Sequence, residues 1–180
     1  RVRDACGHTL ATPVGPAAGP HTQLAQNIVT AWLAGARVVE LKTVQVLDGD
    51  AVRAAVPKPC INAQDEGLNC EWSTELTVAQ AFAEYVHAHL AIAVLAAELD
   101  LDDDVTFTAS VGYDLAGLRQ PAVDGFLEGL HDASGTPTHR EAVAWLEAHL
   151  GDFSRFDRAH LERLSPQVCD TVTISTMHGC

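Results

Sequence analysis

Two residues in this sequence carry side chains well suited to chemistry at a ligand site, and the first is Lys42. It is one of only two lysines in the chain, against nine arginines, and it lies near the end of the β-branched run at residues 37–43. A cationic amine at the end of a buried strand suits an electron-rich ligand atom, such as the anionic edge of a reduced flavin. The alternative is a structural ion pair with Glu40 or another carboxylate.

The second is Cys180, which follows a β-like run at residues 168–175 and the turn Ser-Thr-Met-His-Gly. A thiol there is able to exchange a proton with a substrate, and His178 is close enough in sequence to tune it. A buried thiol or a surface residue is the alternative, and the pattern alone favours that alternative. His87 and His89 are two apart on an expected helix and face different directions, which disfavours a metal site.

Small and polar residues follow the other expected strands. Ala17, Ala18 and Gly19 come after the first, Thr43 follows Lys42 after the second, and Ser110 ends the third. In parallel α/β proteins, ligands bind at the carboxyl ends of strands, and small residues there let a ligand approach the backbone. We therefore expect these clusters to converge on one site.

Alternating strands and helices must position these residues. Residues 14–18 read as a strand, Thr22 can cap a helix from residue 23 that Gly35 ends, and residues 37–43 form the next strand. A long connection at residues 44–74 follows. Thr77 opens a helix at 77–99, whose inward face is formed by Val78, Phe82, Tyr85, Val86 and His89. We expect further helices at 121–130 and 138–150 and strands at 105–111 and 168–175.

This order fits either a doubly wound sheet or a (β/α)₈ barrel. A dinucleotide-binding sheet would show G-x-G-x-x-G after the first strand, whereas the turn here, A-A-G-P-H-T-Q-L, has one glycine, and no P-loop occurs. A typical barrel needs about 250 residues, so four strands make half of one. The sequence predicts an α/β fold, a partial TIM (β/α)₈ barrel comprising about the first half.

Composition excludes several classes of protein. With 24 acidic and 11 basic residues and a net charge of −13, the chain would repel nucleic acid. The sequence contains no run of about 18 uncharged apolar residues, the length that a membrane-spanning helix needs. The five cysteines are odd in number and widely spaced, so we expect reduced thiols. They include no C-x-x-C pair, so we expect no zinc or iron–sulfur site. The N-terminus lacks a secretory signal, which favours a cytoplasmic location, and the abrupt C-terminus suggests part of a longer protein.

Five stretches of the chain also match a known family. T-P-V-G-P-A-A-G-P-H-T-Q-L-A-Q-N-I-V, E-L-K-T-V-Q, D-E-G-L-N-C-E-W-S-T-E-L, S-V-G-Y-D-L-A-G-L and S-T-M-H-G-C resemble the N-terminal part of the selenate reductase flavin/iron–sulfur subunits. These large bacterial proteins are related to dihydropyrimidine dehydrogenase and glutamate synthase small subunits. The resemblance implies that residues 1–180 are the N-terminal part of an FMN-binding-type barrel domain like that of dihydroorotate dehydrogenase, truncated at the C-terminus. It also implies FAD, NAD(P)H and 4Fe-4S clusters in the remainder.

The same resemblance implies roles for the residues singled out above. In such barrels the first-strand stretch packs its backbone against the flavin, as Ala17, Ala18 and Gly19 would do. A second-strand lysine contacts the flavin, which is the role of Lys42.

It also implies a substrate loop and a proton-transfer group. The family's substrate loop contains Gly-Leu, which Gly67 and Leu68 match and Asn69 follows, but Gln64 stands where the family has a substrate-binding asparagine. That difference implies a substrate other than a pyrimidine. The family's base lies in N-x-S-C-P, and here the stretch is I-S-T-M-H-G-C, so Cys180 is the candidate thiol although the asparagine and serine are out of register.

The expected function is that of an oxidoreductase that transfers electrons through a flavin to or from a small substrate, either selenate or a heterocycle. The alternative is a barrel without catalysis that serves as a docking or assembly module for the electron-transfer domains of the same chain or for a molybdenum hydroxylase-type partner. The FMN content of the complete protein distinguishes the two.

Overall fold

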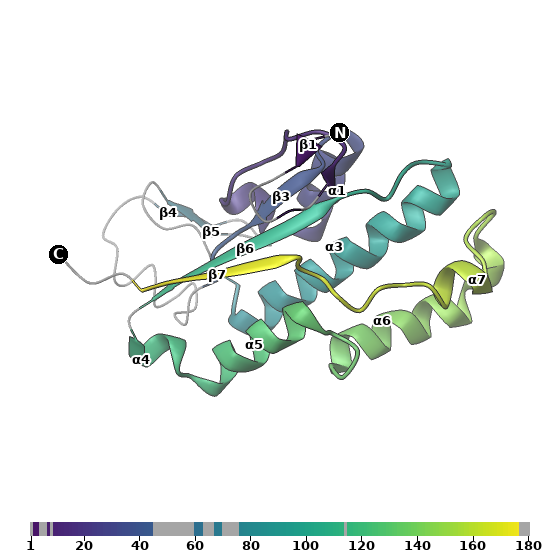
Figure 1. The fold of residues 1–180 in the computed structure, drawn as a ribbon. Coiled ribbons are helices and arrows are strands. Elements are labelled where there is room, and N and C mark those ends of the chain that lie inside the picture. Colours follow the sequence, from purple (N-terminus) through teal and green to yellow (C-terminus); the bar gives the residue numbers. More distant parts are fainter. Residues whose placement is uncertain are drawn as a thin grey trace.

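A three-stranded parallel sheet forms the centre of the molecule. The computed structural model describes residues 2–3, 7, 9–44, 60–62, 67–69, 76–113 and 115–176. Strands β3 (Val38–Leu41), β6 (Thr106–Tyr113) and β7 (Thr171–Thr176) lie in the order β3-β6-β7. Figure 1 shows them side by side, with β6 and β7 running toward the same end of the molecule.

The expected first strand lies against β3 without regular strand geometry. The Arg37 N–H donates to the Val14 carbonyl at 2.9 Å, and the Glu40 N–H donates to the Pro16 carbonyl at 3.1 Å. Between them, a Cβ atom on Gly15 would lie 1.4 Å from the carbonyl oxygen of Val38, so only glycine permits this approach. The segment therefore sits beside β3 at the edge opposite β6.

Each parallel segment thus neighbours the next one along the chain, as in the first half of a barrel. A doubly wound sheet would instead reverse its strand order at a switch point. The α/β fold is confirmed, and within the described residues the sheet remains open.

The main helices agree with the sequence to within a few residues. They are α1 (Ala25–Leu33), α3 (Val78–Leu99), α5 (Pro121–His131) and α6 (Pro137–Ala148). Thr77 caps α3 as expected: its hydroxyl accepts from the Gln80 N–H at 3.3 Å while the Gln80 side chain accepts from the Thr77 N–H at 2.9 Å. Gly35, with φ of +106°, follows α1 as expected.

The predicted cap at Thr22 was wrong. Thr22 lies in a 3₁₀ turn, η1 (Pro20–Thr22), and α1 begins three residues later with Leu24 at its N-cap. The Thr22 hydroxyl instead accepts from the Gly19 N–H at 3.1 Å and donates to the Gly19 carbonyl at 3.0 Å. The hydroxyl therefore stabilises the turn after the first parallel segment rather than the helix.

Several short elements were missed because they span too few residues to show a period. They are the antiparallel pairs β1 (Val2–Arg3) with β2 (Thr9–Leu10) and β4 (Cys60–Asn62) with β5 (Gly67–Asn69), together with α4 (Leu115–Leu118), η2 (Leu150–Asp152) and α7 (Arg158–Leu161).

The core lies between the helices and one face of the sheet. Val39 and Leu41 of β3 and Phe107 and Ala109 of β6 pack there against buried residues of α1, α3 and α5. By length and composition α3 could cross a membrane, which is weak evidence because core helices pass the same test. Val94 packs in a second cluster with Leu146, Phe156 and Leu161. The other eight buried residues of α3 are part of the main core: Ala81, Phe82, Tyr85, Val86, Ala88, Leu90, Ile92 and Ala96.

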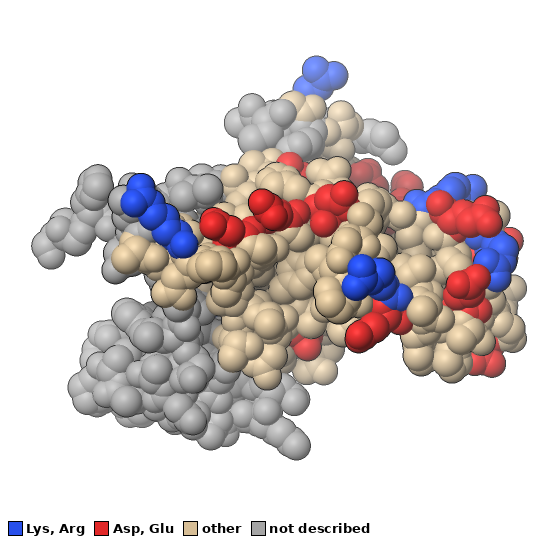
Figure 2. Space-filling view, turned by 90° about the horizontal axis from the view of Figure 1, so that it is seen from below, with Lys and Arg blue, Asp and Glu red and all other residues tan. Residues whose placement is uncertain are grey.

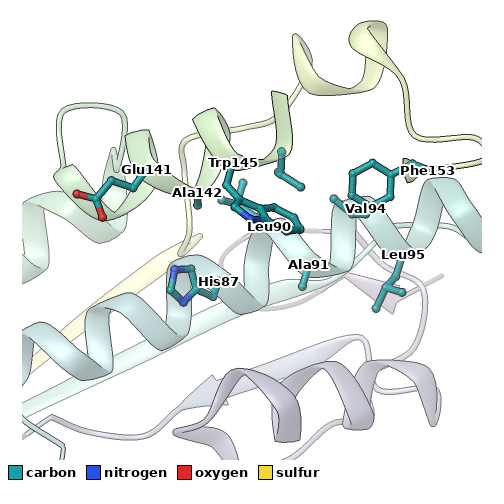
Figure 3. Close-up of a pocket in the computed structure, with 10 residues that line it drawn as sticks. His87, Leu90, Ala91, Val94, Leu95, Glu141, Ala142, Trp145 and Phe153 are labelled. Carbon is teal, nitrogen blue, oxygen red and sulfur yellow. The ribbon is translucent and has the colours of Figure 1, made fainter. Parts of the chain in front are cut away.

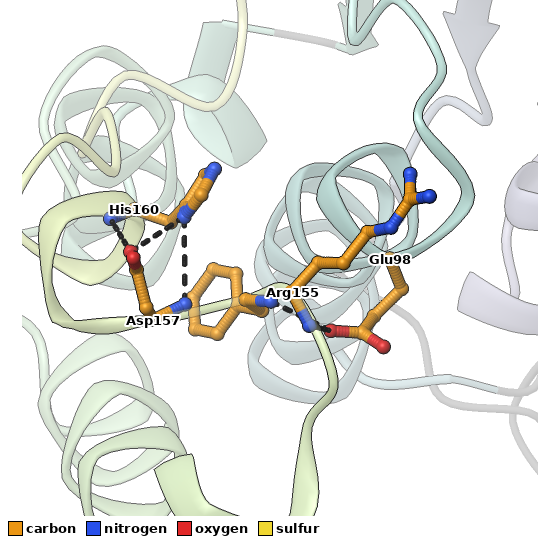
Figure 4. Close-up of polar contacts among 5 residues, drawn as sticks. Glu98, Arg155, Asp157 and His160 are labelled. Atoms are coloured by element: carbon orange, nitrogen blue, oxygen red, sulfur yellow. Dashed lines mark hydrogen bonds and ion pairs between the residues drawn. The ribbon is translucent and has the colours of Figure 1, made fainter.

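The C-terminal end of α3 is tied to the segment before α7 by one carboxylate. Glu98 accepts hydrogen bonds from the backbone N–H groups of Arg155 (2.6 Å; Figure 4), Phe156 (2.6 Å) and Ser154 (3.1 Å). These bonds, that from Phe156 first, hold the pKa of Glu98 below its ordinary value. Glu98 therefore fixes the chain between η2 and α7 onto α3.

Glu98→Gln is expected to raise amide exchange at residues 154–156. A carboxylate whose pKa is lower in the folded than in the unfolded state contributes stability above its ordinary pKa of 4.5, and that stability is lost as pH falls through the folded-state pKa. In the wild type, the protection of these amides, corrected for intrinsic exchange, should therefore decline below pH 4.5. In Glu98→Gln, the protection should be lower than in the wild type at about pH 7 and should depend less on pH.

Glu147→Gln is the matched control, because Glu147 pairs with Arg158 at 2.7 Å while both side chains are more than half exposed. If the two variants gave the same exchange profile at residues 154–156, the role assigned to Glu98 would be wrong.

Candidate functional site

The sheet face turned away from the helices is lined with polar side chains. Alternation along the strands places Glu40, Thr108 and Thr171 on this face, and the register sets them directly opposite one another. Ser110 is two residues further along β6, on the same face. All four residues are partly exposed, unlike the fully buried residues that alternate with them in β3. In a barrel this face is the interior.

The carboxylate of Glu40 joins three of the segments. One oxygen accepts from the backbone N–H of Ala18 at 3.2 Å, and the other accepts from the Ser110 hydroxyl at 3.5 Å. Two of the expected clusters, those after the first segment and in β6, therefore meet at one side chain. From the sequence, Glu40 was expected only as an ion-pair partner of Lys42 and not as part of the site.

Lys42 lies one residue beyond the end of β3, at the carboxyl end of the strand as expected. Its ammonium group donates to the carbonyl oxygen of its neighbour Thr43 at 3.1 Å, and both residues are partly buried. Two hydrogen bonds from other elements hold the backbone of Lys42. The Tyr85 hydroxyl in α3 donates to the Lys42 carbonyl at 2.6 Å, and the Lys42 N–H donates to the Thr22 carbonyl in η1 at 3.4 Å.

Tyr85 is a second residue that the sequence did not reveal. It is fully buried in α3, and burial raises the pKa of its hydroxyl far above the ordinary value, so the hydroxyl remains a donor. Its partner is 43 residues away in the chain. The inward spacing of α3 predicted its burial, but no signal in the sequence identified the contact with Lys42.

The stretch at Ala17, Ala18 and Gly19 is shaped by contacts within the chain. Ala17 is exposed, Ala18 partly exposed and Gly19 buried. The Ala18 N–H is bound by Glu40, and the Gly19 N–H is bound by the hydroxyl of Thr22. A flat ligand here would therefore contact small apolar surface rather than hydrogen-bond to these two amides.

The remaining candidates belong to the expected substrate loop and to the chain after β7. Gly67, Leu68 and Asn69 form β5, which Figure 1 draws toward the end of the molecule where β7 finishes. Gln64, His178 and Cys180 lie outside the described residues.

Other titratable residues have structural contacts. His89 is bound through Nε2 to the Ser165 carbonyl at 2.9 Å, and burial lowers its pKa. Burial also raises the pKa of the Cys169 thiol to about 12, which keeps it a weak nucleophile. In the part of the chain that the structure describes, no cluster of three or more His, Cys, Asp or Glu side chains could hold a metal ion.

A family model describes the whole of this chain. Residues 1–180 match the model of the oxidoreductase YgfK N-terminal TIM-barrel domain. The chain belongs to this family. It is also 45% identical over 188 residues to "Putative oxidoreductase YgfK" of Escherichia coli strain K12 and to the protein of the same name from Escherichia coli O157:H7. No solved structure matches the chain.

Family membership confirms the TIM-barrel class of the domain and an oxidoreductase family, and it leaves the more specific selenate reductase resemblance as a proposal. The alignment covers 97% of this chain but only 18% of each curated relative. The activity, substrates and partners of the whole protein are therefore treated as proposals below.

Proposed function

We propose that this domain supplies part of an FMN site in an oxidoreductase. The observation that carries the proposal is the polar face of the sheet, where Lys42 directly follows Leu41 and Ser110 directly follows Ala109, the last register pair of β3 and β6. Ligands of parallel α/β barrels bind at this end of the strands. The name of the related proteins, oxidoreductase, agrees with this chemistry.

The described residues fit the isoalloxazine part of a flavin. Ala17 and Ala18 offer small side chains to a flat ring, Lys42 offers a cation for its electron-rich edge, and Ser110 offers a hydroxyl. Barrels of this kind often bind phosphate through the loops after strands seven and eight, and the parallel segments described here number four. The phosphate would therefore be held by later parts of the polypeptide.

Flavin supplies the hydride and electron chemistry, and the protein supplies position and electrostatics. Tyr85 holds the Lys42 backbone at the end of β3, and Glu40 holds Ala18 beside it. In this proposal the Cys180 thiol, with His178 near it, moves the substrate proton. Gly67, Leu68, Asn69 and Gln64 belong to the proposed substrate loop.

The proposed electron path begins at NAD(P)H and passes through FAD and 4Fe-4S clusters in other domains of the full protein. A heterocyclic substrate suits the described site better than selenate. An oxyanion needs several cationic groups, and the cation that we propose at this end of the sheet is Lys42.

Flavin analysis of the full-length protein tests this proposal. Acid extraction should release about one FMN in addition to any FAD. Lys42→Met should weaken FMN binding by roughly tenfold and lower the midpoint potential, because the variant loses a charged contact that favours the anionic reduced form. Lys42→Arg should not restore either property, because the guanidinium is longer and planar.

Full-length protein without FMN would overturn the proposal and favour the alternative, a barrel that acts as a docking module. Bound FMN with unchanged affinity and potential in both variants would instead assign Lys42 a structural role.

A further inference from the structure

An apolar groove runs between α3 and α6 on the outer side of the helices. It has a volume of about 570 Å³ and is lined almost entirely by apolar side chains. Leu90, Val94 and Leu95 come from α3, and Trp145 comes from α6. Figure 3 shows His87 and Glu141 at one end of the groove and Phe153, Val94 and Leu95 at the other.

The groove is formed before anything binds to it. The Trp145 ring stacks on His149, with centroids 4.2 Å apart, yet the residue remains 56% exposed. Phe153 directly precedes the segment that Glu98 binds through three backbone amides. Arg158 of α7 pairs with Glu147 of α6 at 2.7 Å. The stacking on His149 and the bonds to Glu98 hold Trp145 and the chain next to Phe153 in the positions that leave the groove open.

We infer that this groove is the docking site for a segment of the polypeptide beyond this domain. The curated relatives carry more than four-fifths of their length outside the aligned region, so proteins of this family have many further segments that could reach the groove. Leu90 and Val94 form a buried floor, and the exposed Trp145 ring stands at its side. A groove of this kind between two helices suits an amphipathic helix.

Charge defines the chemistry of that segment. The chain has a net charge of −13, and acidic side chains are spread over the face shown in Figure 2 with basic ones in fewer places. Glu141 lines one end of the groove, and the other end is apolar. The segment that fits is therefore apolar over most of its contact face, with a lysine or arginine at the end that meets Glu141.

This inference is independent of the flavin proposal, because the groove lies on the helix side of the sheet. Its failure would leave the FMN measurements unaffected, and the absence of FMN would leave the groove unaffected.

Amide exchange of α6 in the full-length protein tests the docking site. Trp145→Ser removes an exposed ring, and Ala142→Glu places a charge in the groove wall. Either change should increase exchange of the α6 amides at least tenfold while the β6 amides remain unchanged. Ala144→Glu is the matched control, because Ala144 is an exposed residue of α6 that does not line the groove, so its effect on the α6 amides should be much smaller than that of Ala142→Glu.

Three results would overturn the inference. Equal α6 exchange in wild type and Trp145→Ser would mean that nothing covers the groove. Protection that weakens on dilution would assign the groove to a second copy of the chain. Protection that disappears when bound small molecules are extracted would assign it to an apolar ligand.

Discussion

Gly15→Ala is expected to destabilise the domain by about 3 kcal/mol or more. The new methyl group would lie 1.4 Å from the Val38 carbonyl oxygen, far inside van der Waals contact, and the atom it meets belongs to the backbone of β3. The segment must move away, which breaks the bonds from Arg37 to Val14 and from Glu40 to Pro16. Thermal unfolding and soluble yield of the full-length protein measure the loss.

Gly125→Ala provides the matched control within the same chain. Gly125 lies inside α5, and a Cβ atom there would meet no other atom within 4 Å. Alanine is the better helix former, so this change should be neutral or stabilise the domain by about 0.5–1 kcal/mol. If Gly15→Ala unfolded at the same temperature as Gly125→Ala, the first segment would not lie against β3 as described.

The sequence predicted the longer elements because their patterns repeat over many residues. The 22 residues of α3 carry a capping residue and an inward apolar face, and both were found where the pattern placed them. Thr22 was misassigned because a threonine before a helix resembles a cap, whereas its hydroxyl bonds back to Gly19. The choice between helix cap and turn depends on the path of the preceding strand, which the local sequence does not specify.

Part of the candidate site could be predicted from the sequence, because the order of strands and helices shows which residues lie at strand ends. Strand ends mark the ligand-binding side of a parallel sheet, so Ala18, Lys42 and Ser110 could be selected from chain order alone. Glu40 and Tyr85 were missed because their partners are distant in sequence and depend on register and helix packing. One signal in the sequence could have identified Glu40. It stands between the buried residues Val39 and Leu41, and alternation along a strand places its carboxylate on the face away from the core.

Glu40→Ala should detach the Ala17–Ala18 stretch from the sheet. Hydrogen bonds to a charged group contribute about 1.5–3 kcal/mol, so amide exchange at Ala18 should rise by roughly 10- to 100-fold. Glu40→Gln keeps one carbonyl oxygen as an acceptor for the Ala18 N–H and removes the charge, so exchange at Ala18 should change much less. Hydrogen-exchange mass spectrometry of the full-length protein resolves both effects.

Glu40→Gln also distinguishes two roles of Glu40 at the proposed flavin site, the positioning of Ala18 and the effect of its negative charge on the flavin. Removing a negative charge near a reduced flavin favours the reduced form, so the midpoint potential should rise in this variant, opposite to the change expected for Lys42→Met. Thr108→Val is the control, because Thr108 lies opposite Glu40 on the same sheet face and carries no charge. An unchanged exchange rate in Glu40→Ala would refute the positioning role of Glu40. An unchanged potential in Glu40→Gln, together with raised exchange in Glu40→Ala, would limit its role to positioning.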